Sequence, residues 1–228
     1  MSTLRSHARV IRVLWVIALG LTIAGIFALM ERLRIGASMA RRQRWTSWFM
    51  RRLTAALPFR VRVSGHMPGQ PMLWVCNHVS WTDIPLLGML APLSFLSKAE
   101  VRTWPVAGWL ALKAGTLFIR RGSGDSKLIQ KQMGQHLLGN HSLVIFPEGT
   151  RVAHGASPPL QAGFAGLYKL LGLPVVPIAV NSGPAYHRLI KRRRQITYQV
   201  GEMIPAGLPR EEIEARVHAA INALNPLP

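Results

Sequence analysis

The chain has 228 residues, with 28 Lys and Arg against 9 Asp and Glu, so its formal net charge is +19 at pH 7. Hydrophobic residues make up 49% of the sequence and charged residues 16%, a composition too apolar for an intrinsically disordered protein. Cys76 is the only cysteine, which excludes an intrachain disulfide framework and a zinc site built from several thiolates. The length predicts one domain with an attached segment.

An apolar run without any charged residue occupies positions 13–30 and reads VLWVIALGLTIAGIFALM. As a helix it covers about 27 Å, close to the hydrocarbon thickness of a bilayer. The pattern favours a retained membrane helix. A helix lying in the interface or in one leaflet is an alternative, as is a cleaved signal peptide, although no cleavage site of the A-x-A kind closes the run.

Arginines are more frequent after this run than before it, with three upstream and seven between positions 32 and 52. The positive-inside rule therefore predicts that the bulk of the protein lies in the cytoplasm. Segment 40–58 also carries Trp45, Trp48, Phe49 and Leu53 at spacings of three to four. As a helix it would present an aromatic face and a cationic face, a composition suited to anionic lipid headgroups. A cationic connector packed on the domain is the alternative.

After the anchoring region, residues 1–58, the sequence alternates short β-rich runs with helical runs. This alternation predicts an α/β fold over residues 59–228, with a sheet covered on its faces by helices. Catalytic groups in such sheets lie in the turns that follow the strands. The expected strands are 59–63, 72–76, 93–97, 116–119, 143–146, 175–180 and 196–200, and the expected helices are 84–90, 99–114, 126–138, 162–171 and 210–224.

The expected strand LWVC runs directly into Asn77 and His78, and Asp83 follows five residues after His78. On a regular helix this offset separates two side chains by about 140°, so a hydrogen bond between them requires an irregular turn. Such a pair suits general-base chemistry, because the carboxylate fixes the imidazole tautomer. No nucleophilic Ser or Cys stands at an elbow motif, which favours direct attack by a substrate hydroxyl. The structural alternative is a helix cap at Asp83 and a turn histidine at His78.

Two further expected strands end in charged residues. The expected strand 116–119 is followed by Arg120 and Arg121. Only one of these two side chains can face a given pocket, because adjacent strand residues point to opposite sides. The other leads into Pro-Glu-Gly-Thr-Arg, which places Glu148 in a region nearly devoid of acids and adds Arg151, a bidentate donor suited to phosphate or carboxylate.

Together these blocks resemble the glycerolphosphate acyltransferase family, and within it the bacterial 1-acyl-sn-glycerol-3-phosphate acyltransferases. NHVSWTD is similar to the family's Asn-His-x4-Asp block and GTLFIRR to its Gly-x-x-Phe-Ile-x-Arg block. FPEGTR matches the third block in full, and VPI resembles the short apolar fourth. The residues that match the four blocks are, in order, Asn77, His78 and Asp83; Gly115, Phe118, Ile119 and Arg121; residues 146–151; and residues 176–178.

The resemblance implies transfer of a fatty acyl group from acyl-CoA or acyl-ACP to a lysolipid hydroxyl at the membrane, by an acyltransferase domain at 59–228. The implied fold is α/β, a mixed sheet covered by helices, with an N-terminal membrane helix. It implies that His78 is the general base and Asp83 its orienting partner. It further implies that the acceptor is bound by Arg121 and the third block, and that the enzyme needs no metal or redox cofactor. The implied acceptor-binding residues are Arg121, Glu148, Gly149, Thr150 and Arg151.

Lysophosphatidic acid is the leading acceptor, because Arg121 and Arg151 suit a phosphate monoester, and the product would be phosphatidic acid. Lyso-ornithine lipid or another lysophospholipid is the alternative. An apolar tunnel for the acyl chain could be lined by residues between the first two blocks, although core packing is favoured for each. The candidates are Trp104, Val106, Trp109 and Leu110.

The high positive charge also admits a nucleic-acid-binding protein or a non-enzymatic membrane adaptor. The basic cluster at 191–194 has no zinc-finger or basic-zipper spacing and no interleaved aromatic residue, so no nucleic-acid partner is expected. The presence of both His78 and Asp83 favours an enzyme over a non-enzymatic adaptor.

Overall fold

The computed structural model describes the chain except residues 1, 37, 70, 121–125, 140, 154, 184–193 and 226–228. A seven-stranded sheet forms its centre, in the order β1-β7-β6-β2-β5-β3-β4. Neighbouring strands are parallel except β6 and β7, so the sheet is mixed, as predicted. The strands are β1 (Phe59–Ser64), β2 (Leu73–Cys76), β3 (Leu93–Lys98), β4 (Leu117–Ile119), β5 (Ser142–Ile145), β6 (Val175–Val180) and β7 (Arg194–Val200).

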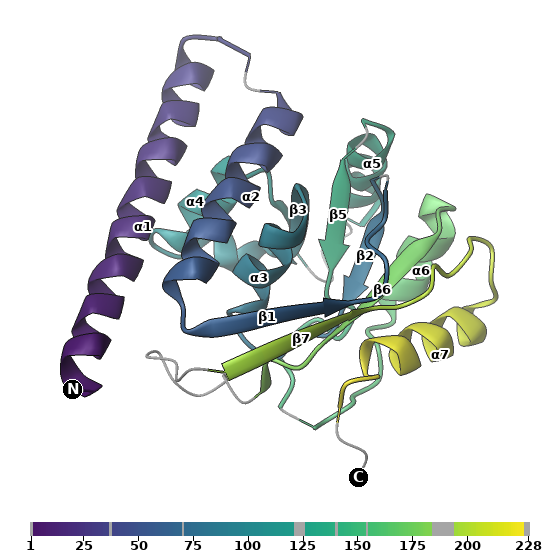
Figure 1. Cartoon of the computed structure of the whole chain (residues 1–228). Helices are drawn as coiled ribbons and strands as arrows, with labels where there is room; N and C mark the ends of the chain where they lie inside the picture. Colours follow the sequence, from purple (N-terminus) through teal and green to yellow (C-terminus); the bar gives the residue numbers. More distant parts are fainter. Residues whose placement is uncertain are drawn as a thin grey trace.

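Helices cover both faces of this sheet (Figure 1). The central strands β2, β5 and β6 are buried along their whole length, which explains why their sequences are nearly continuous apolar runs. The helices are α1 (Ser2–Arg32), α2 (Met39–Ala56), α3 (Asp83–Leu90), η1 (Ala99–Thr103), α4 (Ala107–Lys113), α5 (Ser126–Leu138), α6 (Gly163–Leu171) and α7 (Arg210–Ile221).

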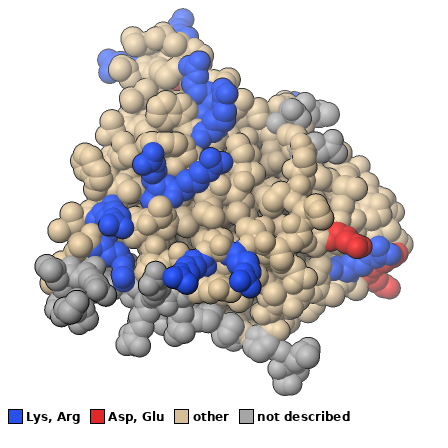
Figure 2. Space-filling view, in the orientation of Figure 1, with Lys and Arg blue, Asp and Glu red and all other residues tan. Residues whose placement is uncertain are grey.

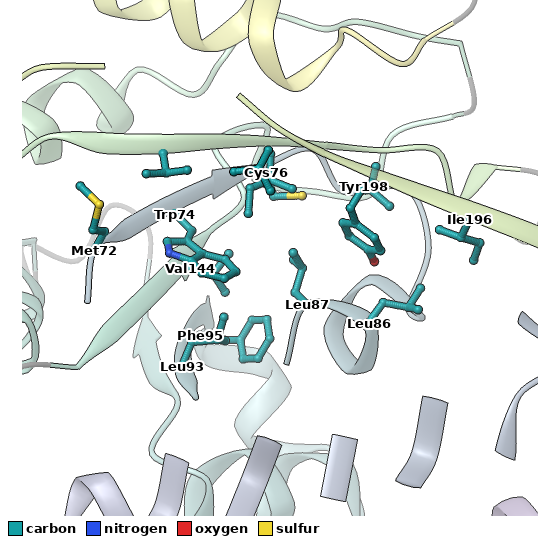
Figure 3. Packing of buried hydrophobic residues seen from close by; sticks show 14 residues of the cluster. Met72, Trp74, Cys76, Leu86, Leu87, Leu93, Phe95, Val144, Ile196 and Tyr198 are labelled. Carbon is teal, nitrogen blue, oxygen red and sulfur yellow. The ribbon is translucent and has the colours of Figure 1, made fainter. Parts of the chain in front are cut away.

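Alternate residues of β2 divide the core between the two faces. Trp74 and Cys76 belong to a cluster with Leu86 and Leu87 of α3 (Figure 3). Leu73 and Val75 belong to a second cluster that includes side chains of α5, α6 and α7. Since α3 begins at Asp83, packing of its leucines against the sheet fixes the position of that carboxylate relative to the end of β2.

The N-terminal helix α1 lies alongside α2 and also contacts α4. The close contact depends on Gly20, where a Cβ would approach the Phe49 ring to 2.4 Å. At the end of α1, Glu31 pairs with Arg42 of α2 at 2.7 Å and with Lys113 of α4. Among the described residues, α1 is the one helix whose length and composition would let it cross a membrane, and 28% of its apolar window is buried in the protein.

The expected helix at 99–114 is wrong, because the structure divides it into η1 and α4. Pro105 disfavours helical backbone at the preceding residue, and Trp104 is extended, with ψ of 132°. Val106 has a φ of 62°, a rare conformation for a β-branched residue. The turn also needs Gly108, whose Cβ would lie 2.5 Å from the carbonyl oxygens of Val101 and Arg102.

The four residues proposed to pack in the core or to line an acyl tunnel lie in or beside this turn. Trp104, Val106 and Trp109 are 52%, 46% and 37% exposed, so the favoured expectation of core packing is wrong for these three. Leu110 is half-buried. The other expected strands and helices are present, with ends that differ by a few residues.

Candidate active site

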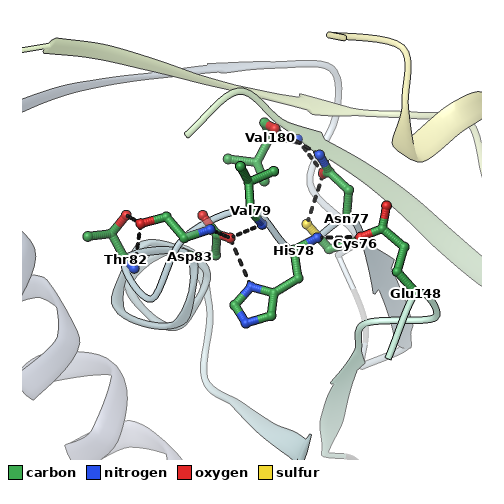
Figure 4. Close-up of polar contacts among 9 residues, drawn as sticks. Cys76, Asn77, His78, Val79, Thr82, Asp83, Glu148 and Val180 are labelled. Carbon is green, nitrogen blue, oxygen red and sulfur yellow. Dashed lines mark hydrogen bonds and ion pairs between the residues drawn. The ribbon is translucent and has the colours of Figure 1, made fainter. Parts of the chain in front are cut away.

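His78 lies in the turn between β2 and α3, at the carboxyl end of a buried strand. Its Nδ1 atom is 2.9 Å from Oδ2 of Asp83, the first residue of α3. The same carboxylate oxygen accepts the backbone N–H groups of Val79 and Ser80, each at 2.8 Å (Figure 4). The irregular turn required by the five-residue spacing is therefore present, with Asp83 reaching back to His78.

This arrangement fixes one tautomer of His78. The Asp83 carboxylate is fully buried and accepts the Nδ1 proton, which leaves Nε2 as the basic nitrogen. Figure 4 shows Nε2 pointing away from Asp83. A hydroxyl that approaches this nitrogen can give up its proton, and the buried carboxylate then stabilises the imidazolium.

Asn77 connects the same turn to β6. Its side-chain Nδ2 donates to the Val180 carbonyl at 2.9 Å, and its Oδ1 accepts the Val180 N–H at 2.8 Å. The sequence showed Asn77 only as part of a motif. Its partner lies 103 residues away, so no local pattern could have shown this contact.

The loop after β5 contacts His78 at three points. Glu148 Oε2 accepts the His78 N–H at 2.8 Å, and the Val152 N–H donates to the His78 carbonyl at 2.7 Å. The Phe146 ring stacks on the imidazole, with ring centres 4.2 Å apart and planes inclined by 22°. Because β2 and β5 are adjacent and parallel, their carboxyl ends bring these two loops together.

Glu148 is 2% exposed. Burial raises the pKa of its carboxyl group to about 7, and the nearby Asp83 charge adds to the rise, whereas the hydrogen bond from the His78 amide opposes it. A carboxyl group with this pKa holds its proton at mildly acidic pH, where an ordinary Glu is ionised.

The other predicted acceptor-binding residues have different environments. Gly149 has a φ of 69°, a left-handed conformation that favours glycine and lets the loop turn after Glu148. Thr150 and Arg151 are exposed on the same loop. Arg121 lies outside the described residues, and so does most of the basic cluster at 191–194.

Covalent catalysis by a nearby side chain has little support in this geometry. Cys76 is fully buried, and burial together with the charges of Asp83 and Glu148 raises the pKa of its thiol. Ser80 is also buried, and its hydroxyl accepts a hydrogen bond from the Thr82 hydroxyl at 3.0 Å. Within the described part of the chain, no group of three or more His, Cys, Asp or Glu residues could hold a metal ion.

A hollow of about 650 Å³ lies at the opposite end of β2 from His78. It is lined by residues that follow β1 and β7, by the residue that precedes β2, and by Val176 of β6 and Val200 of β7. It does not include the His78 turn. Its lining includes His66, Met67, Met72, Glu202 and Met203.

Residues 58–181 match the family model described as Acyltransferase. The chain belongs to this acyltransferase family. The resemblance to glycerolphosphate acyltransferases is confirmed, and every predicted site residue, from His78 to Arg151, lies inside the matched region.

Named relatives of this acyltransferase include proteins with two different acceptors in their names. It is 49% identical over 241 aligned residues to a lyso-ornithine lipid O-acyltransferase of Pseudomonas aeruginosa, covering 97% of this chain and 93% of the relative. It is 33% identical over 143 residues to a 1-acyl-sn-glycerol-3-phosphate acyltransferase of the same organism, covering 61% of this chain and 55% of the relative.

The fold of this acyltransferase is similar to that of a solved structure. The crystal structure of the 1-acyl-sn-glycerophosphate acyltransferase PlsC from Thermotoga maritima aligns with a TM-score of 0.76 at 19% identity. The alignment covers 98% of this chain and 95% of that one, so the similarity of fold extends from the N-terminal helices to α7.

Proposed function

We propose that this acyltransferase transfers a fatty acyl group from an acyl thioester to the hydroxyl group of lyso-ornithine lipid. The relative with that name aligns over nearly the whole of both chains at 49% identity. This similarity reverses the order of acceptors favoured by the sequence, in which lysophosphatidic acid came first. Lysophosphatidic acid becomes the second candidate, supported by the relatives named for 1-acyl-sn-glycerol-3-phosphate.

The contact between His78 and Asp83 carries the proposed mechanism. The Nε2 atom removes the proton of the acceptor hydroxyl as the hydroxyl oxygen attacks the thioester carbonyl. The tetrahedral intermediate then collapses, the carbon–sulfur bond breaks, and the imidazolium returns its proton to the leaving thiolate. Proton transfer by a positioned histidine contributes about 10²- to 10⁴-fold to such a rate.

Arg151 is the proposed contact for the acceptor headgroup. It is exposed on the loop that also contacts His78, and its guanidinium can pair with a carboxylate or a phosphate. Arg121, Gly149 and Thr150 complete the proposed acceptor site. The donor in this proposal is acyl-CoA or acyl-ACP, and the reaction needs no metal or redox cofactor.

Membrane attachment is proposed through the outer surfaces of α1 and α2. On α1, Leu14 and Trp15 are 59% and 70% exposed, although α1 packs against the domain on its other side. On α2, Trp45 and Trp48 are exposed beside several arginines. Such a surface can enter one leaflet while the catalytic domain stays on the cytoplasmic side.

A competition assay tests the acceptor. The purified full-length protein in detergent micelles is incubated with an acyl thioester and equal amounts of lyso-ornithine lipid and lysophosphatidic acid, and the products are separated by mass spectrometry. Preferential formation of acylated ornithine lipid is expected. Preferential formation of phosphatidic acid would assign the protein to the second candidate function.

A further inference from the structure

The backbone of His78 is held by the loop after β5 on both sides of the residue. Its N–H donates to Glu148 at 2.8 Å, and its carbonyl accepts from Val152 at 2.7 Å. We infer that Glu148 is a positioning residue for His78 and does not contact the acceptor headgroup. This role differs from the acceptor-binding role implied by the family resemblance.

The burial of Glu148 supports this inference. Glu148 is 2% exposed, whereas Thr150 and Arg151, two and three residues later, are exposed. A headgroup that reaches the loop from solvent therefore meets Thr150 and Arg151 first. A carboxylate that binds a headgroup has to present its oxygens to the ligand, but Glu148 directs Oε2 at the His78 amide (Figure 4).

Backbone hydrogen bonds on each side of Glu148 also hold its side chain toward His78. Pro147 is buried, and its carbonyl accepts the Gln161 N–H at 2.9 Å. Gly149 adopts its left-handed conformation and donates its N–H to the Phe146 carbonyl at 2.9 Å. These contacts close a tight turn that orients the Glu148 side chain toward the end of β2.

Loss of the Glu148 contact would leave the N–H of the part-buried His78 without its partner, which is unfavourable in a folded protein. The turn would shift to satisfy that amide, and Nε2 would move with it. A displacement of about 1 Å in a reacting group can lower a rate about 10²-fold. The expected defect therefore falls on kcat, with little change in the KM of the acceptor.

Two conservative substitutions test the length of the Glu148 side chain separately from its charge. Glu148→Gln keeps the length of the side chain and an oxygen that accepts the His78 N–H, but it removes the charge. Glu148→Asp keeps the charge and shortens the side chain by one methylene, so it cannot reach the amide without a shift of the backbone. A residue that positions His78 needs a side chain long enough to accept the His78 N–H, whereas a residue that binds a cationic headgroup needs a negative charge.

Initial rates of the full-length enzyme are measured with each acceptor and with the acyl donor. We expect Glu148→Gln to retain kcat within about threefold and Glu148→Asp to lose about 10- to 100-fold in kcat, both with acceptor KM nearly unchanged. The inference is overturned if Glu148→Asp is the more active variant. It is also overturned if Glu148→Gln raises acceptor KM about tenfold or more.

The kinetic readout depends on the proposed acyl transfer, so a second readout is independent of it. Amide hydrogen exchange at His78, measured by mass spectrometry with fragmentation, reports the hydrogen bond itself. Exchange is expected to be similar in the wild type and Glu148→Gln and about tenfold faster in Glu148→Asp. Unchanged exchange in Glu148→Asp would overturn the inference. Absence of acylation by the wild type would instead contradict only the proposed function.

Discussion

At the scale of single residues, Asp83 is not the helix cap that the sequence offered as an alternative, because Thr82 occupies the N-cap position and makes no side-chain capping bond. It is the first residue of α3, and its Oδ2 accepts the backbone N–H groups of Val79 and Ser80 in the turn before the helix. The same oxygen accepts the Nδ1 proton of His78. The carboxylate therefore orders the turn and orients the imidazole together, because the turn brings His78 back over the start of the helix.

The sequence predicted this contact because its partners lie five residues apart and share one turn. It could not predict the contact between Glu148 and the His78 amide, whose partners are 70 residues apart. That contact depends on β2 lying next to β5, an order that local patterns do not specify. The composition of the loop around Glu148 also gave no sign of whether the carboxylate faces solvent or the protein interior.

Arg151→Ala is expected to weaken use of the acceptor far more than use of the donor. A hydrogen bond to a charged group contributes about 1.5–3 kcal/mol, so acceptor kcat/KM should fall about 10- to 100-fold. Steady-state kinetics with each substrate varied in turn provides the measurement. Equal losses for acceptor and donor would contradict a headgroup contact at Arg151.

The pKa of Glu148 predicts a pH dependence of stability. Its folded-state pKa of about 7 lies above its ordinary value of 4.5, so between these values the folded protein holds a proton that the unfolded chain releases. The contribution of Glu148 to the free energy of unfolding is therefore greatest below pH 4.5 and decreases as pH rises through 7, by roughly 1–3 kcal/mol.

Glu148→Gln is expected to remove this contribution. Denaturant unfolding of both proteins at pH 5, 6, 7 and 8 provides the comparison, and the difference in stability between wild type and variant should shift in favour of the variant as pH rises. A difference that stays constant over this range would show that the Glu148 carboxyl is already ionised at the lower pH.

At the scale of helices and strands, sequence patterns located nearly all of the elements because buried strands are apolar runs and helices repeat their apolar residues. The prediction of one helix over 99–114 was wrong because of Pro105. Residues typical of helices continue on both sides of this proline, but the proline itself interrupts the helical backbone. The turn leaves Trp104, Val106 and Trp109 exposed. Trp109 belongs to α4, which contacts α1, one of the two helices that we propose attach the protein to the membrane.

Packing of α1 on α2 can be tested with two glycines of the same helix. At Gly20 a Cβ would collide with Phe49 at 2.4 Å, whereas at Gly25 it would meet nothing within 4 Å. Gly20→Leu is expected to destabilise the contact by about 1–3 kcal/mol, the usual cost of overpacking. Thermal unfolding and the rate of tryptic cleavage between α1 and α2, both measured in detergent micelles, give the readouts.

Gly25→Leu serves as the matched control, since it makes the same change in the same helix. It is expected to leave the cleavage rate near that of the wild type. Equal effects of the two substitutions would indicate that α1 does not remain packed on α2.

At the scale of the whole molecule, charge is distributed unevenly. Figure 2 shows many of the visible Lys and Arg side chains over the part of the surface formed by α2 and β1, while the visible acidic side chains lie mainly over α7. The exposed arginines of α2 are interleaved with Trp45 and Trp48, and the Arg52 guanidinium lies 5.0 Å from the Trp48 ring centre. This surface combines the two features that favour binding to anionic lipid.

The prediction for this surface concerns Arg41 and Arg44, which are exposed on α2. Each basic residue near an anionic membrane contributes about 1 kcal/mol, so replacing both with Gln should lower partitioning onto phosphatidylglycerol vesicles about 30-fold. Sedimentation with vesicles measures this partitioning. Vesicles of phosphatidylcholine alone should show little difference.

A control variant changes the net charge equally on another part of the surface. Arg210 and Arg216 of α7 pair with Glu214 and Glu212 at 3.0 and 2.6 Å. Their replacement with Gln is expected to leave partitioning nearly unchanged. If both double variants lose the same affinity, overall charge and not the surface of α2 directs binding.

The role of His78 as general base is tested most directly by comparing product formation by the wild type and by His78→Ala, with an acyl thioester and lyso-ornithine lipid or lysophosphatidic acid. We predict that the wild type forms an acylated product and that His78→Ala, with a similar unfolding temperature, forms it about 10²- to 10⁴-fold more slowly. Retention of the wild-type rate by His78→Ala would contradict proton transfer by His78.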